Sequence, residues 1–118
     1  MQFAALGIVV LLGGLNSDAA QTEPEKIEAL IRHVETLADA KFIRNGVEYD
    51  AKTAGQFLRG KWKAQEASIT TAQDFIEKIA SQSSTTGKPY LIKLKDGREV
   101  KSGEYLTGEL KKLGMAEK

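Results

Sequence analysis

Residues 42–49 read Phe42-Ile43-Arg44-Asn45-Gly46-Val47-Glu48-Tyr49 and place an Asn-Gly pair between two short runs that contain apolar residues. Both central residues tolerate the positive φ angles of a tight hairpin turn, so this stretch predicts two short antiparallel strands. A second hairpin signal follows in residues 90–101, where Asp96-Gly97 separates two further strand-like runs. Hairpins without a strand–helix–strand crossover favour an α+β fold over an α/β fold.

A helix is expected before the first hairpin. The sequence Thr22-Glu23-Pro24-Glu25 combines a hydroxyl residue, a glutamate three positions on and a proline in the first turn. These features together satisfy the free amides of a helix start. Apolar residues then recur at three- and four-residue steps from Ile27 to Ala38, which predicts an amphipathic helix with one buried stripe.

Two further helices are expected between the hairpins. Asp50 can cap a helix over about residues 51–65, and Thr70 or Thr71 can cap another that ends near Ser81. Both segments carry apolar residues at helical spacing, so each should bury one face. The inward-facing candidates are Ala54, Phe57, Leu58, Trp62, Ala72, Phe75, Ile76, Ile79 and Ala80.

A last helix is expected after the second hairpin. Ser102 can cap it and Gly114 can stop it, with Tyr105, Leu106, Leu110 and Leu113 as its apolar face. The expected order is therefore helix, hairpin, helix, helix, hairpin, helix. No linker, repeat or low-complexity segment divides the sequence, so residues 21–118 are expected to form a single α+β domain.

The amino-terminal residues have the pattern of a secretory signal peptide. Residues 3–15 are apolar and uncharged, too few to span a bilayer as a helix, and the polar run Asn16-Ser17-Asp18 follows them. Cleavage after Ala19 would leave small residues at both recognition positions. We therefore expect a signal peptide over residues 1–20 and a periplasmic or secreted mature protein without stable membrane insertion, the alternative being an uncleaved amino-terminal anchor.

The composition excludes several classes of function. The 118 residues include no cysteine and one histidine, so thiolate zinc and iron–sulfur sites are ruled out and no metal or other cofactor is expected. The absence of cysteine also rules out lipoprotein attachment after the apolar run. The formal net charge is +1, with acidic and basic residues interspersed, so the sequence gives no sign of nucleic-acid binding.

Three strings carry a resemblance to a known family. They are Phe42-Ile43-Arg44-Asn45-Gly46 with Tyr49, Thr71-Ala72-Gln73-Asp74-Phe75-Ile76, and Ser81 through Ser83-Ser84 to Gly87-Lys88-Pro89-Tyr90. Over about residues 26–113 the chain resembles the YfeK-like family of small exported bacterial proteins of unknown function. The resemblance implies export and no established activity. Relatives often carry cysteines where this chain has Ala40-Lys41 and Lys93, so a role that depended on a disulfide is in doubt.

Residues 81–90 contain two patterns that resemble functional motifs, one for phosphate binding and one for catalysis. Thr86-Gly87-Lys88 suggests a phosphate-binding loop, but Gln82 replaces the first glycine of that motif and Pro89 its hydroxyl residue. Ser81, Ser83 and Ser84 could instead supply a nucleophile activated by Lys88, which requires a desolvated lysine. The alternative is a solvated loop whose hydroxyls bond the backbone.

Three side chains outside that loop each have a functional and a structural interpretation. His33 could act as a base, although a lone histidine at the edge of an apolar stripe is more often a half-exposed surface residue. Trp62 lies among basic residues and could stack on a sugar or a base, but its spacing also suits the core. Arg44 could pair with a carboxylate of the protein or with an acidic ligand, and the internal pair is the favoured alternative.

These observations favour a binding or accessory module that presents two loops to an envelope protein or a small ligand, because loops free of packing duties often carry function. A small hydrolase using a loop serine with Lys88 and a homodimeric interaction protein, contacting through the last helix, remain alternatives. No catalytic residue is assigned. The candidate binding residues are Arg44, Asn45, Gly46, Tyr49, Ser81, Ser83, Ser84, Gly87, Lys88 and Tyr90.

Overall fold

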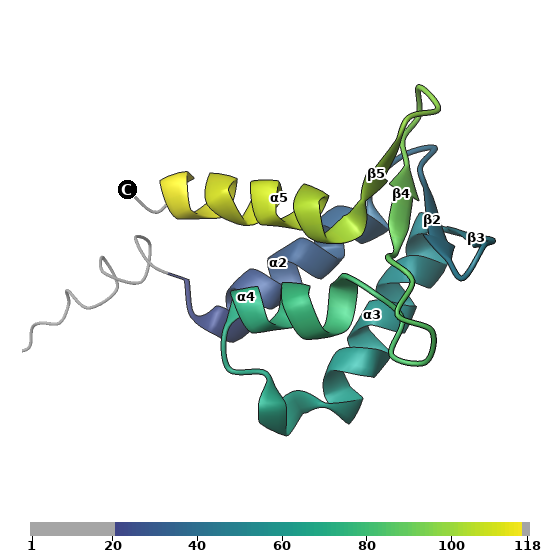
Figure 1. Cartoon of the computed structure of the whole chain (residues 1–118). Helices are drawn as coiled ribbons and strands as arrows, with labels where there is room; N and C mark the ends of the chain where they lie inside the picture. Colours follow the sequence, from purple (N-terminus) through teal and green to yellow (C-terminus); the bar gives the residue numbers. More distant parts are fainter. Residues whose placement is uncertain (1–20, 117–118) are drawn as a thin grey trace, which may run out of the picture.

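The architecture comes from a computed structural model that describes residues 21–116, with side chains to residue 114 (Figure 1). The expected signal peptide over residues 1–20 lies outside the described residues. The helices are α2 (Glu23–Glu35), α3 (Ala51–Ala64), η1 (Glu66–Ser68), α4 (Ala72–Phe75), η2 (Ile76–Ala80) and α5 (Ser102–Ala116). The strands are β2 (Lys41–Arg44), β3 (Val47–Asp50), β4 (Leu91–Lys93) and β5 (Glu99–Lys101).

The two hairpins join into one antiparallel sheet of order β3-β2-β4-β5. The joining pair is β2 with β4, in a register that sets Ile43 opposite Leu91. The sheet lies at one end of the molecule, and α2, α4 and α5 stack beside it (Figure 1). The predicted α+β class is confirmed, and the pairing of the two hairpins is a tertiary feature that the local patterns did not predict.

The helix and turn signals act largely as expected. Thr22 and Glu25 form the predicted capping box of α2, and the Asp50 carboxylate accepts the Thr53 N–H at 2.8 Å to cap α3. Asn45 and Gly46 have φ of 51° and 82°, as the first hairpin turn requires.

The first helix ends earlier than its apolar pattern indicates. The Thr36 hydroxyl donates to the Arg32 carbonyl at 3.0 Å, and α2 stops at Glu35. Asp39 then takes a positive φ of 60°, which turns the chain into β2. Leu37 still packs against the core from outside the helix.

The predicted cap at Ser102 is wrong. Ser102 begins α5, but its side chain is completely buried and its hydroxyl has no hydrogen-bond partner among the described residues. Its backbone N–H donates instead to the Tyr90 carbonyl at 2.9 Å. This bond continues the β4–β5 pairing past the start of β4, and it therefore fixes the helix start.

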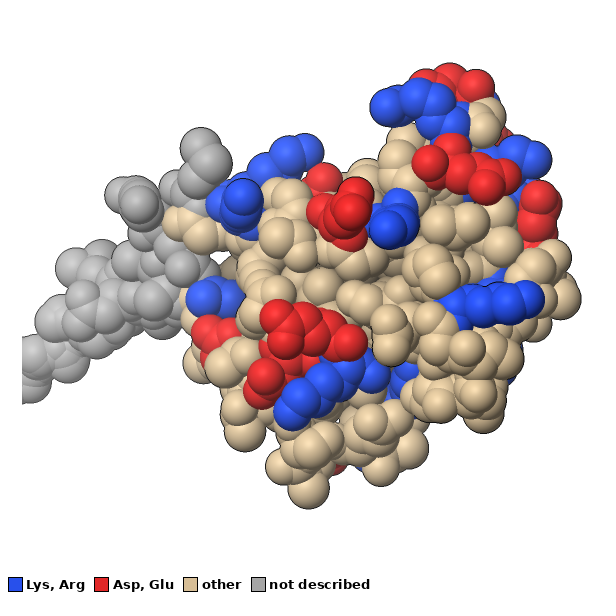
Figure 2. Space-filling view, in the orientation of Figure 1, with Lys and Arg blue, Asp and Glu red and all other residues tan. Residues whose placement is uncertain are grey.

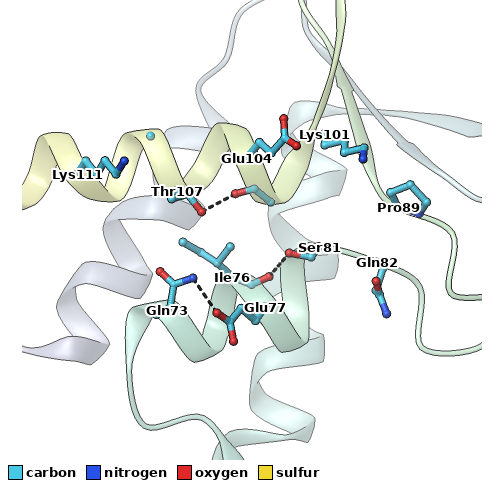
Figure 3. Close-up of a pocket in the computed structure, with 12 residues that line it drawn as sticks. Gln73, Ile76, Glu77, Ser81, Gln82, Pro89, Lys101, Glu104, Thr107 and Lys111 are labelled. Carbon is cyan, nitrogen blue, oxygen red and sulfur yellow. Dashed lines mark hydrogen bonds between the residues drawn. The ribbon is translucent and has the colours of Figure 1, made fainter.

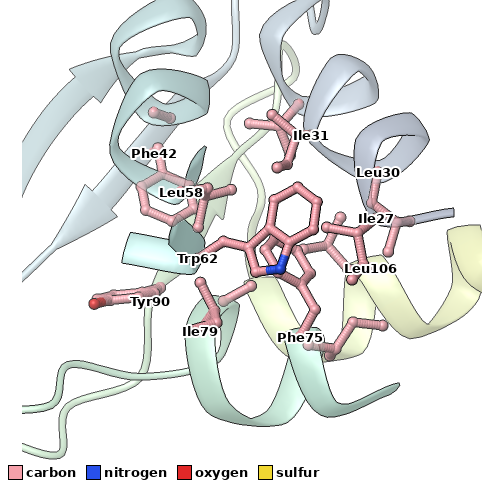
Figure 4. Close-up of a cluster of buried hydrophobic side chains, with 14 of the residues drawn as sticks. Ile27, Leu30, Ile31, Phe42, Leu58, Trp62, Phe75, Ile79, Tyr90 and Leu106 are labelled. Atoms are coloured by element: carbon pink, nitrogen blue, oxygen red, sulfur yellow. The ribbon is translucent and has the colours of Figure 1, made fainter. Parts of the chain in front are cut away.

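The core lies where the helices meet the sheet (Figure 4). Trp62 is 8% exposed and contacts Phe75 edge-on, with ring centroids 6.1 Å apart. Leu58, Ile31 and Leu106 surround it from three different helices (Figure 4). The other buried apolar residues are Ile27, Leu30, Val34, Ala40, Phe42, Ala54, Ile69, Ala72, Ile76, Ile79, Ala80, Tyr90 and Ile92.

Candidate functional site

The two candidate loops lie side by side. Pairing of β2 with β4 brings residues 44–46 next to residues 81–90, and the Asn45 side chain joins them. Its oxygen accepts the Thr86 hydroxyl at 2.6 Å, and its nitrogen donates to the Ser83 hydroxyl oxygen at 3.3 Å. Residues 44–46 and 81–90 therefore form one surface, which we term the loop face.

Residues 81–90 are held by their own hydrogen bonds. Ser83 is only 4% exposed, and its hydroxyl oxygen accepts the backbone N–H groups of Thr85 and Thr86 at 3.3 Å each. Its backbone N–H donates to the Lys88 carbonyl, and its carbonyl accepts the Gly87 N–H, both at 2.9 Å. Ser83 thus bonds the loop backbone, as the structural alternative for this loop expects, but it is buried and not solvated, because a serine-centred turn satisfies its polar groups.

The loop serines do not form a catalytic pair with Lys88. The Ser81 hydroxyl donates to the Ile76 carbonyl at 2.6 Å and closes the end of η2. Ser84 and Lys88 are exposed, and the structure gives neither side chain a partner among residues 21–114. Because Lys88 is exposed, the desolvation that a base at this position would need is missing here.

Arg44 lies against aromatic rings. Its guanidinium carbon is 4.3 Å from the Phe57 ring centroid and 6.0 Å from that of Tyr49. In the part of the chain that the structure describes, no carboxylate lies within ion-pair distance of Arg44, so the favoured internal salt bridge is absent there. Cation–π attraction of about 0.5–2 kcal/mol holds the side chain instead.

A pocket of about 340 Å³ opens beside Arg44. It lies between the β2–β3 hairpin and α3, and we term it the hairpin pocket. Its lining residues are Phe42, Arg44, Tyr49, Thr53, Ala54, Gln56 and Phe57. Of the predicted site residues, Arg44 and Tyr49 line it. Tyr90 lies nearby but is 1% exposed and packs against Phe42 and Phe57.

Lys61, one of the basic residues next to Trp62 in the sequence, is a second cation near this pocket. Its ammonium lies 5.0 Å from the Tyr90 ring centroid and 6.0 Å from that of Phe57. It donates to the Tyr90 hydroxyl at 3.0 Å and to the Gln82 carbonyl at 3.2 Å. The sequence does carry a signal for a cationic surface here, because residues 51–65 and 78–95 contain neither Asp nor Glu.

A wider groove of about 700 Å³ lies on the other side of the loop, between η2 and α5 (Figure 3). Glu77 and Glu104 line it together with Lys101 and Lys111, so its charges balance. Gln73, Ile76, Ser81, Gln82, Pro89, Gly103, Thr107 and Gly108 complete the lining. Several polar groups are already used, as in the donation from the Gln73 amide to Glu77 at 2.9 Å. The groove thus favours no single ligand charge.

The lone histidine ties two helices together. The His33 Nε2 and the Tyr105 hydroxyl are 2.7 Å apart, which links α2 to α5, and Nδ1 lies 3.7 Å from the Glu109 carboxylate. Burial, and to a lesser degree the charge of Glu109, raises the pKa of the Tyr105 hydroxyl. No serine or threonine hydroxyl bonds this imidazole within residues 21–114, so we assign the contacts of His33 with Tyr105 and Glu109 a structural role.

The residues that the structure describes contain no cluster of three His, Cys, Asp or Glu side chains that could hold a metal ion. They also contain no helix whose length and apolar character would let it cross a membrane.

Comparison with known proteins defines the family. Residues 21–114 match the model of a family of unknown function, DUF5329. The chain belongs to this family. The chain is 40% identical over 68 residues to the uncharacterized protein YfeK of Salmonella typhimurium strain LT2, which confirms the resemblance to the YfeK-like family. That match covers 58% of this chain and 57% of YfeK, a little over half the length of that relative. No solved structure matches the chain.

Proposed function

We propose that this DUF5329 protein is a non-catalytic binding module of the bacterial cell envelope that contacts a partner or ligand through its loop face. The observation that carries the proposal is the bridging Asn45 side chain, which bonds both Thr86 and Ser83 across two segments far apart in sequence. A surface assembled from two loops and fixed by hydrogen bonds is pre-organised, which lowers the entropic cost of binding.

Exposed side chains on this surface are free to contact a partner. Ser84 and Lys88 are exposed, and their side chains bond nothing in the described part of the chain. Figure 2 shows blue and tan but no red where the 81–90 loop of Figure 1 runs, whereas blue and red alternate over α5. The loop face thus has a local positive charge that the net charge of +1 conceals.

Export is proposed from the sequence of residues 1–20. The apolar run of residues 3–15 and the small residues Ser17 and Ala19 suit a signal peptidase. The α2 capping box begins at Thr22, so cleavage after Ala19 would leave the described fold intact. Amino-terminal sequencing of the protein recovered from a periplasmic extract would test this, and recovery of intact Met1 from the cytoplasm would overturn it.

The binding proposal is tested by removing two loop-face cations together. Arg44→Ala with Lys88→Ala should lose the envelope components that the parent protein captures and cross-links in an envelope extract. Lys63→Ala with Lys95→Ala removes the same charge from exposed positions outside the loop face and should retain them. Equal capture by both double variants, each folded by circular dichroism, would overturn the proposal.

A further inference from the structure

The hairpin pocket combines an apolar floor with a polar rim. Phe42 and Ala54, 3% and 1% exposed, form part of its floor, and Phe57 forms a wall. Tyr49 and Gln56 contribute a hydroxyl and an amide at the more exposed side. Its volume of about 340 Å³ is at the lower end of the range for small-molecule sites. The pocket therefore suits a small ligand with a ring or a short apolar body.

The donors of Arg44 have no acceptor within residues 21–114. A guanidinium carries five N–H groups in one plane, and stacking on Phe57 at 4.3 Å occupies its face without using them. The side chain is half-buried, so water solvates it only in part. A planar carboxylate matches this fork with two parallel hydrogen bonds.

The surroundings of the pocket favour a negative ligand. Lys61 lies on Phe57 as a second cation, with its ammonium 6.0 Å from the ring centroid. The acidic side chain of Glu48 on β3 faces Lys93, 3.5 Å away. Asp50, at the start of α3, is bound to the Thr53 N–H. Glu48 and Asp50 are thus already partnered, and neither of them neutralises Arg44.

Phosphate is the less suitable anion for this pocket. Phosphate sites are commonly built from several backbone N–H groups at a helix amino terminus. Here that position on α3 is held by the Asp50 carboxylate, whose pKa the Thr53 N–H lowers. The single guanidinium supplies one two-bond fork and one positive charge, which suit a flat monoanionic carboxylate better than a tetrahedral phosphate that is largely dianionic near neutral pH.

We infer that the hairpin pocket binds a small organic carboxylate, with the carboxylate on the Arg44 fork and a ring or apolar body against Phe42, Ala54 and Phe57. This inference rests on the proposed function, because it names the ligand class of one side of the loop face. Tyr49 and Gln56 would set specificity by donating to further polar groups of the ligand.

Benzoate is the probe for this inference. Titrated into the full chain labelled with nitrogen-15, it should shift backbone amide resonances of residues 42–57, with a Kd on the order of 1 mM. Benzamide, of the same shape without charge, and inorganic phosphate should shift them much less. Equal shifts with benzamide, equal shifts with phosphate, or benzoate shifts confined to the groove between η2 and α5 would each overturn the inference.

Two variants assign the carboxylate to Arg44. Arg44→Gln should weaken benzoate binding by about tenfold or more, the loss expected for a charge-assisted bidentate pair. Arg98→Gln, at the exposed tip of the second hairpin, is the matched control and should bind as the parent does. If Arg44→Gln fails to fold, Arg44→Lys keeps the charge without the fork and should still bind more weakly. Unchanged affinity in a folded Arg44 variant would contradict the assignment.

The outcomes separate this inference from the proposed function. If benzoate does not bind but the Arg44 and Lys88 double variant still loses envelope capture, the ligand class is wrong and the binding module stands. If benzoate binds at Arg44 while capture is unaffected by that double variant, the pocket is confirmed and the contact of the loop face with a larger partner is overturned.

Discussion

Single residues show where local chemistry and tertiary context disagree, and Ser102 is the clearest example. A serine before an apolar helical pattern is usually a cap. Here the residue is fully buried at the junction of β4 and α5, so its hydroxyl is removed from water without gaining a partner in the described structure. A buried polar group in that state costs about 1–3 kcal/mol of stability.

Ser102→Ala should therefore raise the free energy of unfolding by about 1 kcal/mol. Ser81→Ala is the control with the opposite expected sign, because the Ser81 hydroxyl donates to the Ile76 carbonyl at 2.6 Å. This variant should lower the free energy of unfolding by a similar amount. Guanidinium chloride unfolding followed by circular dichroism measures both. Destabilisation by Ser102→Ala would mean that the hydroxyl has a partner, such as a buried water.

At the scale of elements, α3 carries two glycines whose roles differ. A Cβ on Gly55 would lie 2.1 Å from the Glu35 Cγ, so a side chain at this position would force the Glu35 side chain of α2 to move. A Cβ on Gly60 would meet nothing within 4 Å. One glycine is thus required by packing, and the other only weakens its helix.

Gly55→Ala should destabilise the protein by about 1–3 kcal/mol, because the new methyl group displaces Glu35 and disturbs its ion pair with Arg59. Gly60→Ala should stabilise it by up to about 1 kcal/mol through helix propensity alone. Thermal unfolding of the two variants side by side measures the difference. Equal effects of the same sign would show that the close contact between α2 and α3 is misplaced.

The helix caps predict a dependence of stability on pH. Backbone N–H donors lower the pKa of Asp50 at the start of α3 and of Asp74 at the start of α4. A carboxylate with a lowered folded-state pKa contributes stability that is complete above the unfolded pKa of about 3.9 and is lost as the pH falls through the folded value. Acidification below about pH 4 should therefore weaken the fold.

The double variant Asp50→Asn with Asp74→Asn should lose less stability on acidification, because an asparagine amide oxygen can accept the same backbone N–H groups without titrating. Urea unfolding midpoints measured from pH 6 downward for parent and double variant test the idea. If the double variant lost as much stability on acidification as the parent, other carboxylates would be responsible for the pH dependence.

The helices and turns also show which features can be predicted from the sequence alone. The capping box at Thr22, the Asp50 cap and the Asn45-Gly46 turn were predictable because each depends on neighbours within four residues. The bridge from Asn45 to Thr86 and the stacking of Arg44 on Phe57 depend on the pairing of β2 with β4 and on the packing of α3. Those contacts join residues 41 and 13 positions apart, and periodicity or capping rules contain no information about them.

At the scale of the whole molecule, the loop face depends on a core that all the long helices share. Phe57 contacts Arg44 and also packs against the core, and Leu58, the next residue of α3, is completely buried. Tyr90 likewise bonds Lys61 through its hydroxyl while its ring packs on Phe42. The loop face is therefore continuous with the core, and it should not unfold independently of the core.

Trp62 makes this cooperativity measurable, because it is the single tryptophan of the chain and lies between α2, α4 and α5 in the core (Figure 4). At 8% exposure its emission should be blue-shifted and resistant to acrylamide quenching. On guanidinium chloride unfolding, its red shift should have the same midpoint as the loss of helical circular dichroism, since one core serves every helix. Leu106→Ala, a buried α5 substitution costing about 2–5 kcal/mol, should move both midpoints together. Separate midpoints would mean that α5 detaches first and that the fold is two units.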